Sequence, residues 1–356
     1  MAKPVVTLEV LPAAYGDSLL VTSTGPAGIW RMLIDTGTDE CWPSLKSRLA
    51  RLPAGKDHHR HIDLLVITHV DHDHIGAASA LLSDTDLDLT FGDIWFNAPS
   101  MPASRSAAEG QFLAKLLAGE NVPLPWNRAW HGKHAVTGGA GGFVEMPVAK
   151  GQPRITLLSP TPDSLATMFK VWDAEVGRAR DAGMTSPEPV GSRGAMDLTT
   201  LARSVTPEDH APANGSSIAF LWEHQGASIL FGADLHPAIG VPALKALAAH
   251  RRMAGPIKVD VFKVSHHGSK ANVTNELMQC VQAKHYVIST NGAIFGHPND
   301  EAMARLIVSS GGNPKLWFNY KTERTTKWGS QTLQQTHGYS VVYSDDPSHG
   351  VVLTLG

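Results

Sequence analysis

The chain has 356 residues, of which 42% are hydrophobic and 18% charged, and its formal net charge is −3 at pH 7. This composition belongs to a globular protein with a sizeable core, so it excludes a disordered tail, a fibrous repeat and a disulfide scaffold. The two cysteines, Cys41 and Cys280, lie far apart and have no CxxC partner, and we expect both to be buried thiols.

The N-terminal segment predicts neither export nor membrane insertion. It carries one lysine and an early proline, without the charged and apolar regions of a secretory signal. No stretch of the chain approaches the roughly 18 apolar residues that a membrane span needs. We therefore expect a cytoplasmic protein with no membrane partner, and the sequence does not indicate a protein partner.

The first part of the chain combines strands with helices. Apolar alternation and β-branched residues predict strands at 5–10, 19–22, 29–34 and 62–68, and a helix at 42–52. A polar cluster follows the fourth strand, and the Ala/Leu-rich residues after it predict a further helix. Because ligands of open α/β sheets bind at the carboxyl ends of strands, this cluster marks a candidate site.

Two stretches in the middle of the chain have irregular composition. The first, about 100–151, holds a predicted helix at 107–117, and the second covers about 182–215. The regular elements predicted after them are strands at 217–222, 228–231, 258–264, 286–289, 316–319, 340–343 and 351–353, and helices at 237–250, 275–281 and 300–309. Strands with helices on both sides indicate an α/β layered sandwich, and we interpret the irregular stretches as insertions into a single domain.

Positive charge is concentrated in the last third of the chain. Residues 251–330 contain eleven Lys and Arg against five Asp and Glu. A basic face of this kind suits an anionic substrate, such as a nucleic acid or a nucleotide. A chance excess of charge on a solvated surface explains the same numbers equally well.

The 18 histidines include a dense cluster with carboxylates, directly after the predicted strand at 62–68. In an extended segment residues i and i+2 point to one side, so His69, Asp71 and Asp73 can converge. The turn into the next helix can bring His74 to the same point. Imidazole and carboxylate groups at this density are typical ligands of a divalent metal ion.

Three later motifs also follow predicted strands and could meet this cluster at one edge of the sheets. Each is weak alone, because a turn aspartate, a surface histidine pair or a capped loop would explain it. They are Asp234 in FGAD, His266 and His267 in VSHHGS, and His297 in FGHP. Their joint occurrence predicts a single site.

The set LIDTG, THVDHDHIG, FGAD and SHHGS resembles the metallo-β-lactamase-fold hydrolase superfamily. Within it, the H-x-D-x-D-H form and the segments NGSS, HHGSK and NGAIFGHP are most similar to the hydrolase domain of ComEC-type DNA-uptake competence proteins. The resemblance implies a four-layer αββα sandwich. It also implies a dinuclear metal site in the cleft between the two sheets.

The resemblance divides the ligands between two metal ions that share one carboxylate. It assigns them as His69 and Asp71 for the first ion, Asp73, His74 and one of His266 and His267 for the second, and Asp234 as the bridge. Asp71 and Asn214 stand where many members have histidine. Because oxygen ligands favour harder ions, we expect two divalent ions that are either Zn²⁺ or Mn²⁺.

Several other residues have two interpretations each. Asp35 and Asp17 either orient a ligand imidazole or cap a turn. His297 either donates a proton to the leaving group or contacts a substrate phosphate. The remaining candidate substrate contacts are Asn214, Ser269, Lys270 and Lys263, and the two lysines could equally be surface residues.

These motifs lead to three functional hypotheses. The leading one is a metal-dependent hydrolase that activates water to cleave a phosphodiester, as a nuclease or a nucleotide phosphodiesterase, with Asp73, His297 and Asp35 as its catalytic candidates. The second is a lactone, thioester or β-lactam hydrolase on the same fold, with a neutral or apolar cleft. The third is a non-catalytic binding protein with a degraded site, which the chemically competent ligand positions disfavour. Basic residues of 251–330 on the cleft side would favour the first over the second.

Overall fold

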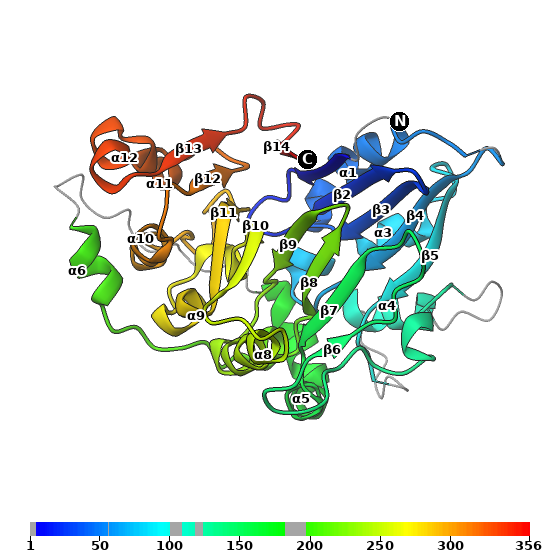
Figure 1. Cartoon of the computed structure of the whole chain (residues 1–356). Coiled ribbons are helices and arrows are strands. Elements are labelled where there is room, and N and C mark those ends of the chain that lie inside the picture. The colour runs from blue at the N-terminus through cyan, green and yellow to red at the C-terminus, as the bar shows by residue number, and fades with distance from the viewer. Residues whose placement is uncertain (1–4, 56, 100–108, 118–123, 182–196) are drawn as a thin grey trace.

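The computed structural model describes residues 5–55, 57–99, 109–117, 124–181 and 197–356. Its strands form a six-stranded and an eight-stranded sheet, and helices cover the outer side of each (Figure 1). The predicted four-layer αββα sandwich is therefore confirmed.

The six-stranded sheet has the order β14-β1-β2-β3-β4-β5. Its strands are β1 (Val5–Val10), β2 (Leu19–Gly25), β3 (Gly28–Ile34), β4 (Arg60–Val66), β5 (Leu89–Trp95) and β14 (Val351–Leu355). Strands β3, β4 and β5 run parallel, so their carboxyl ends lie at one edge of the sheet. Helices α1 (Trp42–Ala50), α3 (Ala78–Ser83), α4 (Glu109–Leu117) and α5 (Pro162–Asp181) contribute to the apolar core on its outer face.

The eight-stranded sheet has the order β13-β12-β11-β10-β9-β8-β7-β6, and β9 to β13 are parallel. Its strands are β6 (Val144–Glu145), β7 (Arg154–Ser159), β8 (Ala219–His224), β9 (Ala227–Phe231), β10 (Ile257–Lys263), β11 (Val281–Ile288), β12 (Lys315–Phe318) and β13 (Ser340–Tyr343). Helices α6 (Leu198–Arg203), α8 (Pro237–His250), α9 (Asn275–Cys280) and α10 (Asp300–Ser309) pack on its outer face.

Short helices complete the chain. The α-helical ones are α2 (His72–Ile75), α7 (Pro212–Gly215), α11 (Glu323–Thr326) and α12 (Gln331–His337). The 3₁₀ helices are η1 (Asp39–Cys41), η2 (Arg128–Trp130), η4 (Ser265–Gly268) and η5 (Lys327–Gly329). Two of them, α2 and η4, carry the histidine motifs of the candidate site.

Alternation along the strands builds three apolar cores, which is why the sandwich has four layers. In β9, Ile229 and Phe231 point into the core between the sheets, whereas Leu230 points into the core under the outer helices. In β3, Met32 points into the core between the sheets and Leu33 points outward. Because successive strand residues face opposite sides, one strand contributes to two cores.

Most predicted elements are present, and several agree to the residue, such as β1, α8, α10 and β13. Strands β5 and β7 and the long helix α5 were not predicted. The prediction of irregular structure from 182 to 215 is wrong where α6 and α7 form, and residues 182–196 lie outside the described part of the chain.

The predicted burial of the two cysteines is confirmed, since Cys41 and Cys280 are both buried and free. Burial raises the pKa of both thiols. In the part of the chain that the structure describes, no helix combines the length and the apolar character required to cross a membrane.

Candidate metal centre

The polar motifs meet where strands of both sheets end. The first histidine cluster follows β4, Asp234 follows β9, and the paired histidines follow β10. In each sheet the relevant strands are parallel, so topology alone brings their carboxyl ends to one edge.

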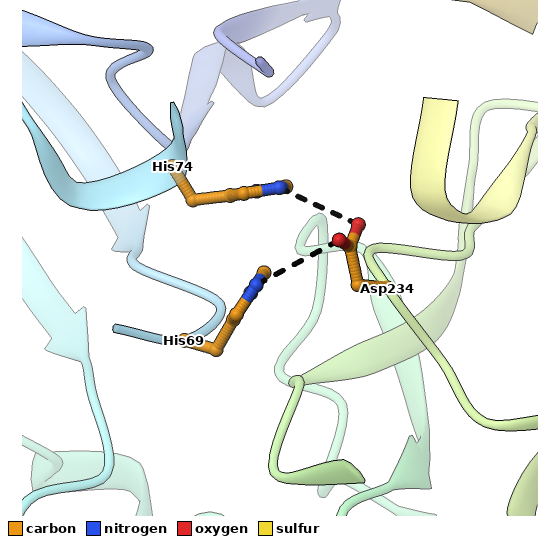
Figure 2. Close-up of side chains that lie close together, drawn as sticks. All are labelled: His69, His74 and Asp234. Atoms are coloured by element: carbon orange, nitrogen blue, oxygen red, sulfur yellow. Dashed lines mark ion pairs between the residues drawn. The ribbon is translucent and has the colours of Figure 1, made fainter. Parts of the chain in front are cut away.

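Asp234 lies at the centre of the site, and each of its two oxygens faces two imidazoles. Asp234 Oδ1 is 3.4 Å from His74 Nε2 and 3.9 Å from His267 Nε2. Asp234 Oδ2 is 3.8 Å from His69 Nε2 and 3.5 Å from His266 Nε2. Figure 2 shows His69 and His74 pointing toward Asp234 from the other half of the chain. A carboxylate in this position can bridge two cations.

The side chains around Asp234 form two groups. The first group consists of His69, Asp71, His266 and Asp234 Oδ2. The second group consists of Asp73, His74, His267 and Asp234 Oδ1. The site therefore offers nitrogen and oxygen donors on both sides of one shared carboxylate.

The second group is compact and buried. His267 Nε2 lies 3.2 Å from Asp73 Oδ2 and 3.2 Å from His74 Nε2. Ligands bound tetrahedrally at zinc distances of 2.0–2.1 Å stand about 3.3 Å from one another. These three residues thus have the spacing of ligands to one ion.

The first group is more open to solvent. Asp71 Oδ2 lies 3.5 Å from His69 Nε2, and the Asp71 side chain is 30% exposed. Asp71 occupies the N-cap position of α2, yet its side chain makes no capping hydrogen bond. Its carboxylate therefore faces the site.

Hydrogen bonds fix the tautomers of both imidazoles in the second group. His74 Nδ1 lies 2.7 Å from Asp35 Oδ2, and His267 Nδ1 lies 2.8 Å from the carbonyl oxygen of Ser289. Carboxylate and carbonyl oxygens only accept, so each Nδ1 carries the hydrogen. The lone pair of each neutral ring is then on Nε2, which faces Asp234.

Thr68 fixes His69 in the same way. The Thr68 hydroxyl donates to Asp35 Oδ2 at 2.8 Å, and its backbone N–H donates to Asp35 Oδ1 at 2.7 Å. With its hydrogen used in this way, Thr68 Oγ1 accepts from His69 Nδ1 at 3.0 Å. The lone pair of the neutral His69 ring is therefore also on Nε2, which is directed at the site.

Nearby carboxylates raise the pKa values of histidines in the cluster. Burial lowers the pKa of His74, but the carboxylates of Asp234, Asp73 and Asp35 raise it well above its usual value. Burial likewise lowers the pKa of His266, but Asp234 and Asp209 raise it to about 10. Imidazoles that hold protons this strongly stand where cations are stabilised.

The donor set fits a divalent metal ion. His69 Nε2 and Asp234 Oδ1 are buried and have no hydrogen-bond partner among the described residues. Two Nε2 lone pairs 3.2 Å apart, in His74 and His267, need a proton or a cation between them. Histidine and aspartate side chains in these groups could hold a metal ion.

The profile of the Metallo-beta-lactamase superfamily matches residues 31–292, which includes every ligand candidate described above. The chain belongs to this superfamily. A comparison with curated proteins finds no match. Most members of the superfamily are metal-dependent hydrolases, and its fold agrees with the two sheets and outer helices found here.

Two aspartates predicted to orient imidazoles or to cap turns lie behind the superfamily site. Asp35 is fully buried against His74 and Thr68, so it positions a histidine and does not face a substrate. Asp17 Oδ1 lies 3.3 Å from His267 Nδ1. Such outer partners hold a ligand ring in orientation.

The prediction that Lys263 contacts a substrate phosphate is wrong. Lys263 is completely buried, and its ammonium group forms an ion pair of 2.7 Å with Asp17 Oδ2. Burial raises the pKa of Asp17, but Lys263 and His267 lower it below its usual range. A buried charge requires a partner, and Lys263 supplies it from the end of β10.

His297 lies beside the first group. Its ring is 5.1 Å from that of His266 and stacks on Phe295. Its Nδ1 is buried without a hydrogen-bond partner among the described residues. Burial, together with His266 and His267, holds the pKa of His297 well below its usual value. The neutral ring suits a substrate contact better than a donated proton.

The candidate substrate contacts other than Lys263 all have partners within the protein. Asn214 is buried and donates to Asp209 Oδ2 at 2.6 Å. The Ser269 hydroxyl accepts from a backbone N–H two residues later, and Lys270 Nζ lies 3.6 Å from a carboxylate oxygen of Glu301. Their roles toward a substrate remain predictions.

Two residues that were not predicted, Asp209 and Asn272, contact the site from behind. Asp209 lies in a stretch expected to be irregular, and Asn272 follows the paired histidines by a few positions. Neither belongs to a strand-end motif of the superfamily type. The only signal in the sequence was the length of the loop that holds Asp209, since long loops are often functional.

Proposed function

We propose that the chain is a metal-dependent hydrolase with two divalent ions, Zn²⁺ or Mn²⁺, shared by the first and second groups. The observation that carries this proposal is the position of Asp234, with two imidazole Nε2 atoms near each of its oxygens. Bound divalent ions would polarise a water molecule and lower its pKa toward roughly 7. The protein itself would then need no nucleophile.

The protein's own groups would set the charge of such a centre. Asp71, Asp73 and Asp234 would neutralise about three of the four positive charges of two divalent ions. A centre with little net charge can admit an anionic substrate. Asp35 and Asp17 would hold the rings of His74 and His267 from behind.

We propose a phosphodiester as the substrate, in a nucleic acid or a nucleotide. The resemblance of the HHGSK and FGHP motifs to ComEC-type hydrolase domains supports this choice. Two cationic side chains lie near these motifs. Lys270 is the last residue of the HHGSK motif, and Arg324 lies against Gly292 in the loop that leads to His297.

A second candidate is an acyl hydrolase that opens a lactone, thioester or β-lactam. It is favoured because several basic side chains of 251–330 have partners within the protein. Lys284 pairs with Asp260, and Arg251 pairs with Glu223. The guanidinium of Arg305 donates to backbone carbonyls. Basic side chains held by such partners are less available to an anionic substrate.

Hydrolysis of bis(p-nitrophenyl) phosphate tests the proposal. Metal-stripped protein refilled with Mn²⁺ or Zn²⁺ should hydrolyse it, and the double variant Asp71→Ala, Asp73→Ala should not. Asp86→Ala removes an exposed carboxylate far from the strand-end motifs and serves as the control. Wild-type protein that is inert here but opens a lactone or a β-lactam would establish the second candidate instead.

A further inference from the structure

His266 and His267 are neighbours in the chain but face different oxygens of Asp234. The backbone makes this possible, because His266, His267 and Gly268 all have positive φ values, of 45°, 52° and 85°. Non-glycine residues rarely adopt the left-handed region, so two of them in succession make the turn strained. Strain of this kind is retained where it directs side chains to a functional position.

A chain of hydrogen bonds fixes the tautomer of His266. Asp209 Oδ2 only accepts, so the group of Asn272 that lies 2.9 Å from it is the amide nitrogen. The amide oxygen of Asn272 then faces His266 Nδ1 at 2.8 Å, and Nδ1 must carry the hydrogen. In the neutral ring the lone pair of His266 is then on Nε2, which lies 3.5 Å from Asp234 Oδ2.

His266 is thus held in the same way as the other three imidazoles of the site. His69, His74 and His267 each have Nδ1 bound to an acceptor on the protein and Nε2 directed at Asp234. The acceptor for His266 is the amide of Asn272, which the carboxylate of Asp209 orients. Asp209 also lies within 3.5 Å of His266 Nδ1 itself.

The amide oxygen of Asn214 is buried without a hydrogen-bond partner among the described residues, and its amide nitrogen faces Asp209. That nitrogen donates to Asp209 Oδ2 at 2.6 Å, next to the amide of Asn272. Asn214 and Asn272 together hold Asp209 in one orientation. The side chain at position 214 therefore supports the carboxylate that supports His266.

We propose that both paired histidines are metal ligands, with His267 in the second group and His266 completing the first group in place of a histidine at position 214. Asp209, acting through Asn272, is the positioning residue for His266. This inference rests on the proposed dinuclear centre. It assigns the first ion the ligands His69, Asp71, His266 and Asp234.

Metal binding by stripped protein tests the inference without any substrate. Co²⁺ would be titrated into wild type, His266→Ala and Asp209→Asn, with calorimetry for stoichiometry and visible absorption for the ligand field. Wild type should bind two ions. His266→Ala should bind one ion at concentrations that saturate wild type, with a changed Co²⁺ spectrum, and Asp209→Asn should weaken the first ion about 10- to 100-fold.

The matched control is His236→Gln, because His236 Nε2 lies 3.6 Å from the other oxygen of Asp209 and is not part of either group. It should bind two ions with affinities close to wild type. Asp209→Asn keeps the shape of the side chain and provides a second test if His266→Ala does not fold.

The outcomes separate the inference from the proposed function. Two ions bound by His266→Ala with unchanged affinity and spectrum would overturn the role of His266 alone. The same result for Asp209→Asn would overturn its role as a positioning residue. Wild type that binds fewer than two ions would overturn the dinuclear centre, and this inference with it.

Discussion

The two groups around Asp234 differ in burial. In the second group, Asp73, His74 and His267 are all buried. The first group includes Asp71, which is 30% exposed, and His266, whose side chain is 19% exposed. One half of the site is closed within the protein, and the other half faces the solvent from which a substrate arrives.

The supports of the two groups differ as well. The second group is supported by Asp35 and Asp17, which lie in short turns next to strands, and by the buried Lys263 at the end of β10. The support of His266 comes from Asp209, between α6 and α7. We infer that the second group binds its ion more tightly, because its ligands are closer together and better buried.

The largest effect is expected from Asp234→Asn, because this carboxylate serves both groups. Loss of its charge should weaken both ions by more than the roughly 100-fold that removal of an outer partner costs. Calorimetric titration of the metal-stripped protein measures this, with Asp86→Ala as the control. Retention of either ion at wild-type affinity would show that Asp234 is not a bridge.

Lys263→Met should destabilise the second half of the site strongly, since it leaves the buried Asp17 carboxylate without its ammonium partner. Breaking a buried ion pair in this way costs about 3–5 kcal/mol in the free energy of unfolding. Urea denaturation of the metal-free protein checks this value. The double variant Lys263→Met, Asp17→Asn should recover part of the loss, and a single-variant cost below about 1 kcal/mol would contradict the argument.

Asp35→Asn should weaken the binding of both ions, whereas Asp209→Asn should weaken the binding of the first ion only. Asp35 contacts His74 directly and reaches His69 through Thr68, and an outer partner of a ligand contributes about 10- to 100-fold in affinity. We expect the larger effect on the second ion. Calorimetric titration separates the two ions, and equal effects of the two variants on the second ion would remove the distinction between the groups.

The last expected effect is a pH dependence of stability in the metal-free protein. The pKa values of His74 and His267 are raised, and that of His266 is raised to about 10, because carboxylates outweigh the lowering effect of burial. A raised folded-state pKa contributes stability that is fully present below the unfolded value near 6.5 and is lost as pH rises through the folded value.

The melting temperature of metal-free protein should therefore fall between pH 6.5 and pH 10. Metal-loaded protein should keep its stability over this range, because cations replace the protons on Nε2. Parallel thermal scans of both forms measure the difference. A metal-free form that becomes more stable toward pH 10 would contradict the raised pKa values of these histidines.

Much of the fold could be predicted from the sequence because strand and helix patterns are local. The alternation in Val5–Val10 and the amphipathic pattern of Asp300–Ser309 each specify one element. Strand β5 escaped prediction, since LTFGDIW carries a glycine and an aspartate in the middle of its run. Helix α5 also escaped prediction.

The motif residues of the candidate site were visible for a related reason. His69, Asp71, Asp73 and His74 stand together in sequence, so their density alone indicates chemistry. Lys263 was misjudged because the sequence does not tell whether a lysine at a strand end is exposed. Its burial against Asp17 depends on how the two sheets pack.

The sequence by itself determined the strand-end motifs, the α/β layers and the kinds of donor atoms available for a metal. Only the tertiary structure decided which oxygen of Asp234 each histidine faces, and that Asp209 supports His266. The physical reason is the distance along the chain over which each kind of interaction acts. Periodicity and turn chemistry act over a few residues, whereas ligand geometry and hydrogen-bond direction depend on contacts between segments as distant in sequence as those of His74 and His267.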